Sequence, residues 1–351
     1  MNAVESPRPI LLVSPWPSRN NGLSNYAGRY KTAIEHMGRV VETERLYFWG
    51  EKLSAWKWIK VLSHAKKVGA TSVLIQHTPT CSGPFLPWFL SRARARGLRT
   101  AVVSHETPNT YARHLEKIPP LRNAYLAYER ETARRASAFI VHTHIHQREM
   151  LKLGAPVAEV IPHAILNMPE RILPRAPETI ALYGQIGRKK GHDLVLDAVQ
   201  SREPGTFPVL EVWGAPGVGQ EKYLEELRAK VRSDFSDRIL FRGYLPDETK
   251  AEAFARMRLA LFPYRWISQS GAMAEAVAHS VPYLASDIPF FTEFQATNGC
   301  GDLFSSDDSG HLAARMQELL IRESTWTPED FAQVHRNLSI ESCCARLLKH
   351  L

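Results

Sequence analysis

Two loop segments in the second half of the chain combine glycine with groups that bind phosphate. The first, YGQIGRKKGHD (183–193), places the cations Arg188, Lys189 and Lys190 between a strand-like run and a helix-like run. A cation held beside a ligand neutralises the charge that builds on a departing diphosphate. The same pattern also fits a solvated basic turn, and its spacing favours neither interpretation. The segment lacks the GxGxxG pattern of dinucleotide sites.

The second segment, SQSGAMAEAVA (268–278), follows the apolar run LALFPY. A helix that begins at Ser270 and Gly271 would turn unpaired backbone N–H groups and the positive end of its dipole towards phosphate oxygens. Glycine permits close approach of a ligand, and the serine adds a hydroxyl. Glu275, in the first turns of this helix, is placed to accept hydrogen bonds from a diol such as ribose. The alternative is an acid that stabilises the helix dipole by under about 1 kcal/mol.

These segments lie in a chain that alternates strand-like and helix-like runs. Short apolar runs such as ILLV (10–13) and SVLIQH (72–77) are typical of buried parallel strands. Their alternation with helical stretches predicts parallel sheets with helices on both faces. The predicted helices span residues 22–37, 52–68, 87–97, 120–136, 144–153, 191–200, 219–233, 247–256, 271–280, 309–322 and 327–350.

A break in this pattern divides the chain into two domains. Residues 167–178, NMPERILPRAPE, contain three prolines and show neither period, which indicates a linker. We therefore expect two doubly wound α/β domains, over residues 1–168 and 177–326, and a C-terminal helix over 327–351 that crosses back to the first domain. In such sheets a ligand site lies at the carboxyl ends of the strands, here in a cleft between the domains.

The composition, 44% hydrophobic and 23% charged over 351 residues, is that of a globular protein. Four cysteines without metal-ligand spacing, and an N-terminal apolar run too short for a signal peptide, indicate a reduced, cytosolic chain. Residues 1–170 carry 23 Lys and Arg against 12 Asp and Glu, and the remainder carries 21 against 24. The basic first half suggests an anionic partner (phospholipid, a diphosphate-linked acceptor or nucleic acid) or a face kept basic for solubility.

Two basic stretches favour the membrane among these partners. KLSAWKWIKVLSHAKK (52–67) interleaves tryptophan with lysine, and PWFLSRARARGLR (87–99) places Trp88 and Phe89 ahead of four arginines. Both are typical of helices that rest on an anionic membrane surface. The alternative is that the aromatic side chains pack on the sheet while the cations face water.

Four segments, in this order, resemble the C-terminal domain of the retaining glycosyltransferases of the GT-B fold, in particular family 4. They are ALYGQIGRKKGHDLVLDAV, FRGYLPDETKAEAFARMRLALFPY, SQSGAMAEAVAHSVPYLASD and NGCGDLFSSDD. The first half matches more weakly, through NNGLSNYAGRY, VVSHETP, IVHTHIHQREMLKLG and VIPHAI. The resemblance implies two Rossmann-like domains that face a central cleft. The second would bind a nucleotide-sugar donor and the first an acceptor.

The resemblance also implies roles for individual residues. Lys190 stands where the family keeps a lysine on the donor diphosphate, and Glu275 stands where a glutamate binds the ribose. His105 matches a histidine that faces the donor sugar; the alternative is a hydrogen-bonded core histidine. The catalytic residues implied are His105, Lys190 and Arg188, and the donor-binding residues are Gly22, Gln185, Gly243, Tyr244, Leu245, Ser270, Gly271, Ala272 and Glu275.

Two positions depart from the family pattern. Family members commonly carry an arginine where this chain has Gln185, and Arg188 would supply that charge from a different part of the loop. Many members also carry a glutamate that contacts the sugar hydroxyls where this chain has Ile267. The subgroup with an SQSG-type helix start often lacks this acid. The resemblance therefore identifies a nucleotide site and leaves the sugar open.

The activity implied is transfer of a hexosyl group, with retention, from a UDP- or GDP-linked sugar to an acceptor hydroxyl in bacterial polysaccharide or glycolipid biosynthesis. No Asp-x-Asp pair occurs, so no metal or other cofactor is expected. The expected partners are a saccharide or lipid-linked acceptor and an anionic membrane, not nucleic acid, and the expected place is the cytoplasm or the inner face of the plasma membrane. The alternatives are a sugar-nucleotide epimerase of the same fold and a non-catalytic sugar-nucleotide-binding protein.

Overall fold

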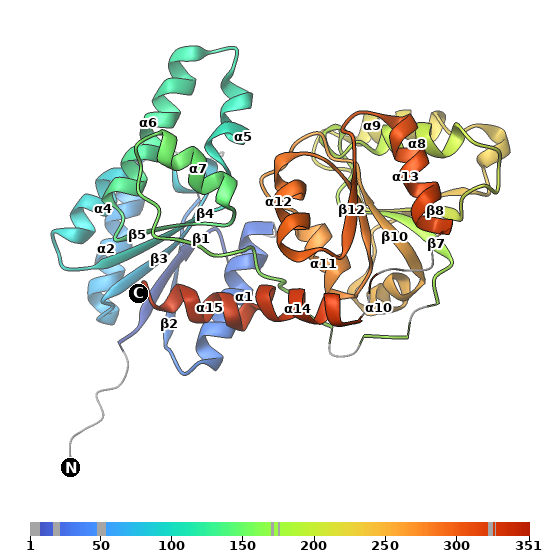
Figure 1. Cartoon of the computed structure of the whole chain (residues 1–351). Helices are drawn as coiled ribbons and strands as arrows, with labels where there is room; N and C mark the ends of the chain where they lie inside the picture. The colour runs from blue at the N-terminus through green and yellow to red at the C-terminus, as the bar shows by residue number, and fades with distance from the viewer. Residues whose placement is uncertain are drawn as a thin grey trace. The chain divides into compact units, whose positions relative to one another are not determined.

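The computed structural model describes residues 8–16, 22–47, 54–169, 172–174, 176–321, 326 and 328–351. The chain divides into a first unit, Met1–Leu166 with Leu338–Leu351, and a second unit, Asn167–Asn337 (Figure 1). Several predicted features fall partly outside the described residues. These are the loop before Gly22 (17–21), three linker positions (170, 171 and 175), and single ends of the helices predicted over 52–68, 309–322 and 327–350.

The first unit is built on a six-stranded parallel sheet with the order β2-β1-β3-β4-β5-β6. Its elements are β1 (Ile10–Ser14), α1 (Gly22–His36), β2 (Val41–Arg45), α2 (Trp56–Val68), β3 (Ser72–His77), α3 (Pro79–Ser82), α4 (Leu86–Arg94), β4 (Arg99–Ser104), α5 (Pro108–Ala112), the 3-10 helix η1 (Arg113–Leu115), α6 (Pro119–Arg135), β5 (Ala138–Val141), α7 (His144–Lys152), β6 (Glu159–Val160) and α15 (Ile340–Leu348).

Both faces of this sheet are covered, as its apolar strands require. Helices α2, α4, α6 and α7 pack on one face in a core that includes Trp58 and Phe89, and α1 and α15 pack on the other with Tyr26 and Tyr30. A strand buried on both faces is apolar along its whole length, which is why β1, β3 and β4 were recognisable from sequence.

The second unit is built on another six-stranded parallel sheet, with the order β12-β11-β10-β7-β8-β9. Its elements are β7 (Thr179–Tyr183), the 3-10 helix η2 (Arg188–Lys190), α8 (His192–Gln200), β8 (Val209–Trp213), α9 (Glu221–Ala229), the 3-10 helix η3 (Ser233–Phe235), β9 (Ile239–Gly243), α10 (Asp247–Arg256), β10 (Met257–Phe262), α11 (Gly271–Ala278), β11 (Tyr283–Ser286), α12 (Pro289–Asn298), β12 (Gly301–Phe304), α13 (Ser309–Ile321) and α14 (Pro328–Leu338).

The helices of the second unit also cover both faces of their sheet. Helices α8, α9 and α13 share a core with Ile180 and Leu182 of β7. Helices α10 and α11 pack against each other outside this core, since Phe254 stacks on His279 with ring centroids 4.5 Å apart. Helix α14 contacts α11, because His335 Nε2 lies 2.7 Å from the Val277 carbonyl oxygen. The predicted fold class, α/β with two doubly wound parallel sheets, is confirmed. That the two units face a cleft stays a prediction.

One prediction of local structure was wrong, and several elements were not predicted, among them β2 and α12. The stretch expected as one helix over 327–350 forms α14 and α15, because Ser339 has an extended backbone and caps α15 by accepting the Ser342 N–H at 3.1 Å. Strand β2, VETER, was missed because it is an edge strand whose residues are mostly only partly buried. Helix α12 was missed because its ten residues, PFFTEFQATN, do not separate strongly into an apolar and a polar face.

Each sheet has a point where its strand order reverses, between β1 and β3 in the first and between β7 and β10 in the second. At such a point successive loops run to opposite faces of the sheet and leave a crevice at the carboxyl ends of the strands, where α/β proteins bind ligands. The loop after β7, and the loop after β10 with the first turn of α11, contain the phosphate-binding candidates of the second unit, and Gly22 lies in the first unit.

Glycine at two positions lets the loop after β7 lie against the neighbouring loops. A Cβ added to Gly191, whose φ is +65°, would lie 1.9 Å from the carbonyl oxygen of Pro263 in the loop after β10. A Cβ added to Gly214, whose φ is +152°, would lie 1.9 Å from the carbonyl oxygen of Gly184. Real Cβ atoms do not approach backbone this closely. The loop after β7 therefore meets the loop after β10 at Gly191, and meets the loop after β8 at Gly214, only because both positions are glycine.

We expect Gly191→Ala to destabilise the second unit strongly. Gly219 is the matched control, because its φ is +73° and nothing lies within 4 Å of an added Cβ. Gly219→Ala should cost only the strain of a left-handed backbone, about 1–2 kcal/mol. Gly191→Ala should lower the free energy of unfolding by at least about 2 kcal/mol more, measured by urea unfolding, because backbone must move. Equal losses in the two variants would contradict the close approach.

Candidate functional site

The second unit gathers the predicted phosphate-binding residues at the reversal point of its sheet. Gln185 and Lys190 lie in the loop after β7, and Ser270–Ala272 open α11 after β10. A Cβ added to Gly184 would lie 3.0 Å from the Cβ of Ala272, so the first loop lies directly against the first turn of α11. Residues that are about 80 positions apart in the sequence thus share one site because their strands are neighbours.

The N-terminus of α11 offers backbone N–H groups to a ligand. Ser270 is the N-cap, and its hydroxyl accepts the Met273 N–H at 3.2 Å. The Ala274 N–H donates to the Ser270 carbonyl at 3.1 Å, as in a regular helix. Gly271 and Ala272 occupy the first two helical positions, where an N–H has no partner within the helix. The hydroxyl of Ser270 is therefore engaged in capping, and the two following N–H groups are those that face a ligand.

Lys190 is the cation of this loop that lies closest to the loop after β10. Its Nζ is 3.6 Å from the centroid of the Tyr264 ring, a cation–π contact. Burial lowers the pKa of Lys190 to about 7. An amine held this way binds a diphosphate strongly once it is protonated, since the charge then sits in a partly desolvated place.

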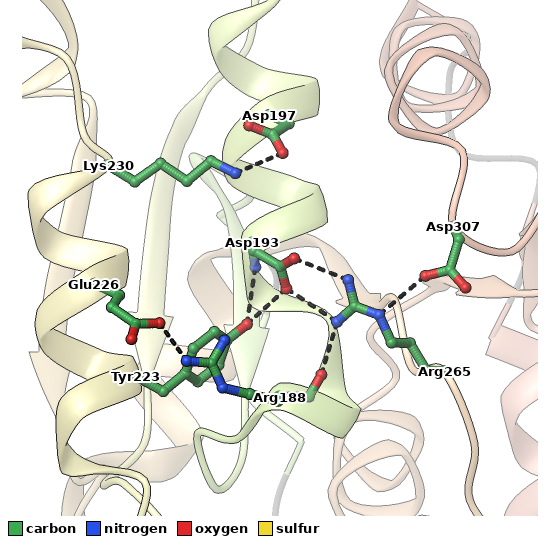
Figure 2. A network of polar contacts seen from close by, with 8 residues as sticks. All are labelled: Arg188, Asp193, Asp197, Tyr223, Glu226, Lys230, Arg265 and Asp307. Carbon is green, nitrogen blue, oxygen red and sulfur yellow. Dashed lines mark hydrogen bonds and ion pairs between the residues drawn. The ribbon is translucent and has the colours of Figure 1, made fainter.

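Arg188, predicted to supply charge in the same loop, is directed elsewhere. Its guanidinium forms an ion pair with Glu226 on α9 and lies 4.7 Å from the centroid of the Tyr223 ring (Figure 2). Its backbone N–H donates to Gln220 Oε1 at 3.2 Å. The structure thus brings Lys190 to Tyr264 and brings Arg188 to helix α9.

Glu275 lies on α11 with both carboxylate oxygens hydrogen-bonded. The Tyr183 hydroxyl, at the end of β7, donates to Oε2, and Lys250 Nζ on α10 donates to Oε1 at 2.7 Å. Lys250 also pairs with Asp247 at 2.6 Å. Burial alone would lower the pKa of Lys250, but the hydrogen bonds to Asp247 and Glu275 raise it above its usual value. Burial, and then Glu275, raises the pKa of Tyr183. The carboxylate is therefore fixed in position at the end of β7.

Of the other donor-binding candidates in the second unit, Gly243, Tyr244 and Leu245 lie at the end of β9, and Gln185 lies in the loop after β7. The Gly214 N–H donates to the Gly243 carbonyl at 2.7 Å, which joins these strand ends. Tyr244 is exposed and Leu245 is buried. Gln185 is exposed, and a Cβ added to Gly217 would lie 3.1 Å from its Cδ. Gly243, Tyr244 and Gln185 therefore all border the strand-end edge of the second sheet.

Sequence analysis missed four residues that position these groups. Tyr264 and Arg265 support the Lys190 loop, and Tyr183 and Lys250 support Glu275. Tyr264 and Arg265 could have been noticed, because they follow a predicted strand directly in LALFPYR. Lys250 lies in an ordinary helical stretch and gives no sequence signal.

The predicted residues His105 and Gly22 lie in the first unit. Gly22 begins α1, and nothing lies within 4 Å of a Cβ added to it. His105 follows β4 and is buried, with Nε2 2.6 Å from Gln76 Oε1 and Nδ1 3.3 Å from His142 Nε2. Burial, helped by His142, lowers the pKa of His105 well below its usual range, so the imidazole is neutral at pH 7. Both ring nitrogens already lie within hydrogen-bond distance of protein partners.

Two features of the described residues bear on metals and membranes. Among the residues that the structure describes, no three or more His, Cys, Asp or Glu side chains are grouped so as to hold a metal ion. No helix in the described ranges combines the length and the apolar character needed to cross a bilayer.

Comparison with known proteins connects this site to a family. Residues 177–322, most of the second unit, match the family described as Glycosyl transferases group 1. The lipopolysaccharide core biosynthesis mannosyltransferase LpsB of Rhizobium meliloti (strain 1021) is 27% identical over 181 residues, covering 47% of this chain and 49% of LpsB. The chain thus spans about half the length of the curated relative it matches.

Solved structures resemble the whole chain. Sucrose-phosphate synthase from Thermosynechococcus elongatus has a TM-score of 0.76 at 16% identity, covering 97% of this chain and 98% of that one. Anabaena HepE, solved with UDP and glucose, has a TM-score of 0.71 at 14% identity over the same shares. The lipopolysaccharide outer core galactosyltransferase WaaB has a TM-score of 0.66 at 12% identity, again over 97% and 98%. The chain therefore has the GT-B fold, and its second unit contains a segment that matches the group 1 glycosyl transferases.

Proposed function

We propose that this chain is a retaining, family 4-like glycosyltransferase that moves a hexosyl group from a UDP- or GDP-linked sugar to an acceptor hydroxyl. One observation carries the proposal. Lys190, the first-turn N–H groups of α11 and Glu275 lie together at the reversal point of the second sheet, within the segment that matches the glycosyl transferases. A protonated amine and two helix N–H groups suit a diphosphate, and a fixed carboxylate suits a ribose diol.

The chemistry follows from which charges the site supplies. As the bond between the anomeric carbon and the diphosphate oxygen breaks, negative charge builds on that oxygen, and Lys190 with the N-terminus of α11 stabilises it. The acceptor hydroxyl attacks the anomeric carbon from the same face, and the departing phosphate oxygen takes its proton. No residue then has to act as a covalent nucleophile, and no metal is required to neutralise the diphosphate.

The names of similar proteins support the pathway class. LpsB is a mannosyltransferase of lipopolysaccharide core biosynthesis, and WaaB is a galactosyltransferase of the lipopolysaccharide outer core. HepE was solved with UDP-glucose. We therefore propose a saccharide or lipid-linked acceptor in bacterial polysaccharide or glycolipid biosynthesis.

We expect Lys190→Ala and Glu275→Ala each to abolish glycosyl transfer while the protein stays folded. Removing one stabilising charge from a leaving group typically costs about 100- to 1,000-fold in rate. The control is Lys222→Ala, which removes an exposed lysine on α9. Transfer would be measured with a panel of UDP- and GDP-sugars, chosen by thermal stabilisation, and circular dichroism would confirm the fold. Turnover at the native rate in either variant would overturn the assignment.

The same experiment separates the alternatives. A transferase releases free nucleoside diphosphate slowly from one donor even without acceptor. An epimerase would instead convert the sugar to its epimer, and a non-catalytic binding protein would be stabilised by a donor without consuming it.

Donor affinity should depend on pH through Lys190. Its pKa is lowered to about 7, so the free protein loses this charge as the pH rises through that value, whereas a bound diphosphate favours the protonated amine. The diphosphate of a nucleotide sugar is esterified at both ends and does not titrate near neutrality. Calorimetry should therefore show a dissociation constant that is flat below about pH 7 and rises about tenfold per pH unit above it. A flat profile up to pH 9 would remove Lys190 from the diphosphate site.

We further propose that the first unit contacts anionic lipid. The structure buries much of the predicted amphipathic surface, because Trp58, Phe89 and Leu90 pack in the core of the unit. Trp56, however, is 63% exposed at the start of α2. The exposed cations on and beside the neighbouring helices α2 and α4 are Lys60, Lys66, Lys67, Arg92, Arg94, Arg96 and Arg99. An aromatic anchor beside clustered cations fits a negatively charged membrane surface.

We expect the protein to float with vesicles that contain phosphatidylglycerol and not with vesicles of phosphatidylcholine alone. Binding should fall as salt rises, because the Debye length is about 10 Å at 0.1 M and shorter above that. Trp56→Ser should weaken flotation, whereas Trp58, being buried, provides no surface to test. No binding to the anionic vesicles at low salt would contradict the proposal.

A further inference from the structure

Arg265, in the loop between β10 and α11, forms the most extensive set of polar contacts near the site (Figure 2). Its guanidinium donates two parallel hydrogen bonds to the Asp193 carboxylate, Nη1 to Oδ1 at 3.0 Å and Nη2 to Oδ2 at 2.8 Å. The same Nη1 donates to the Arg188 carbonyl at 2.7 Å, and Nε lies 3.0 Å from Asp307. Paired N–H···O bonds between an arginine and a carboxylate fix direction as well as distance.

The acid at the centre of this set is itself held in place. Asp193 lies in the first turn of α8, and the Tyr223 hydroxyl on α9 donates to its Oδ1 at 2.6 Å. Although burial by itself raises it, the bonds from Arg265 and Tyr223 lower the pKa of Asp193 to about 2. The carboxylate is therefore ionised throughout the range in which an enzyme works, and the pair does not release with pH.

The loop between β10 and α11 contacts each of the four residues 188–191, which include Lys190. The Arg265 guanidinium donates a hydrogen bond to the Arg188 carbonyl, and the backbone N–H of Arg265 donates to the Lys189 carbonyl at 2.9 Å. The ring of Tyr264 lies 3.6 Å from Lys190 Nζ, and Gly191 packs against the Pro263 carbonyl. Residues 263–265 thus contact each of residues 188–191, across more than 70 positions of the sequence.

Given the proposed function, we infer that Arg265 is a positioning residue for donor binding. With Tyr264 it holds the η2 loop so that the ammonium of Lys190 is in place beside the N-terminus of α11 before the diphosphate arrives. A loop without this clamp would have to be ordered by the donor itself, which weakens binding. Arg265 acts through Lys190, because its own guanidinium is already committed to Asp193, Asp307 and the Arg188 carbonyl.

The groups around Lys190 allow its state to be read directly. Burial lowers the pKa of the neighbouring His192 to about 4 and raises that of Tyr264 to about 12. Neither group changes charge near pH 7, and Asp193 is ionised there too. Lys189 is exposed. A change in the reactivity of Lys190 near pH 7 therefore reflects the environment of its own amine and not the titration of a neighbouring group.

The test compares Arg265→Met with Lys230→Met. Lys230 pairs with Asp197 at 2.6 Å and also connects the ends of α8 and α9, but it makes none of the contacts to the η2 loop (Figure 2). Lys190 is labelled with a limiting amount of an amine-acylating reagent from pH 5 to pH 10, and its acylation is quantified by mass spectrometry against the exposed lysines. This measurement requires neither donor nor turnover.

In the native chain and in Lys230→Met, Lys190 should become half reactive near pH 7. In Arg265→Met that midpoint should shift upward by at least one unit, towards an ordinary lysine, because water reaches the released loop. The KM for the donor should rise at least tenfold with a smaller change in kcat. If Arg265→Met does not fold, Arg265→Lys, which keeps the charge and loses the paired bonds, should give a shift in the same direction.

An unchanged Lys190 midpoint in the folded Arg265 variant would overturn the inference, even if activity fell, since Arg265 would then only stabilise the unit. The proposed function is tested separately. If the native chain binds no UDP- or GDP-linked sugar, that function is lost, while the labelling result still decides whether Arg265 positions Lys190.

Discussion

The site depends on how closely two stretches of backbone approach each other at the carboxyl edge of the second sheet. The loop after β7 leads to α8 on one face and the loop after β10 leads to α11, away from that core, so the two would ordinarily diverge. Here Gly191 lies against the Pro263 carbonyl, closer than any side chain permits. A ligand at this edge would meet peptide groups beside the side chains of Lys190 and Glu275, which suits the many oxygens of a diphosphate.

Charge in this region is distributed less simply than its sequence suggests. Three adjacent cations read as a basic loop, yet the fold gives them different surroundings. Arg188 is neutralised by Glu226, whereas Lys190 rests on an aromatic ring with no acid recorded among its contacts. Arg265 is a fourth cation, and its charge is shared between Asp193 and Asp307. The lowered pKa of Lys190 shows that its amine, unlike the two arginine side chains, is desolvated without a paired acid among the described residues to offset the cost.

The fold and the placement of the site were predictable because they depend on local signals. Buried parallel strands are continuous apolar runs, and the residues that follow them fall at one edge of the sheet whatever the rest of the chain does. Lys190, Ser270, Gly271 and Glu275 were found by that argument. Strand β2 escaped it because an edge strand needs no apolar run.

The supporting contacts could not be predicted in the same way, because their partners are distant in sequence. Arg265 meets Asp193 72 positions away and the Arg188 carbonyl 77 positions away, and Tyr183 meets Glu275 across 92. Only the strand order brings these pairs together, and strand order is not encoded in any single segment. The amphipathic pattern of α2 and α4 was ambiguous for a related reason, since an aromatic residue that packs on a sheet and one that faces a membrane have the same spacing along a helix.

The first unit places polar groups at its strand ends by a different physical strategy. Its histidines His105, His142 and His163 lie close together, with ring centroids 4.8 to 6.3 Å apart, and burial lowers the pKa of each. A cation among them would lose its hydration and would be repelled by a second charge in the cluster, so the cluster stays uncharged. His105 therefore cannot serve as an acid at neutral pH while it remains buried. A contact with a sugar through its ring would require His105 to give up Gln76 or His142, whereas the amine of Lys190 in the second unit could meet a diphosphate by charge.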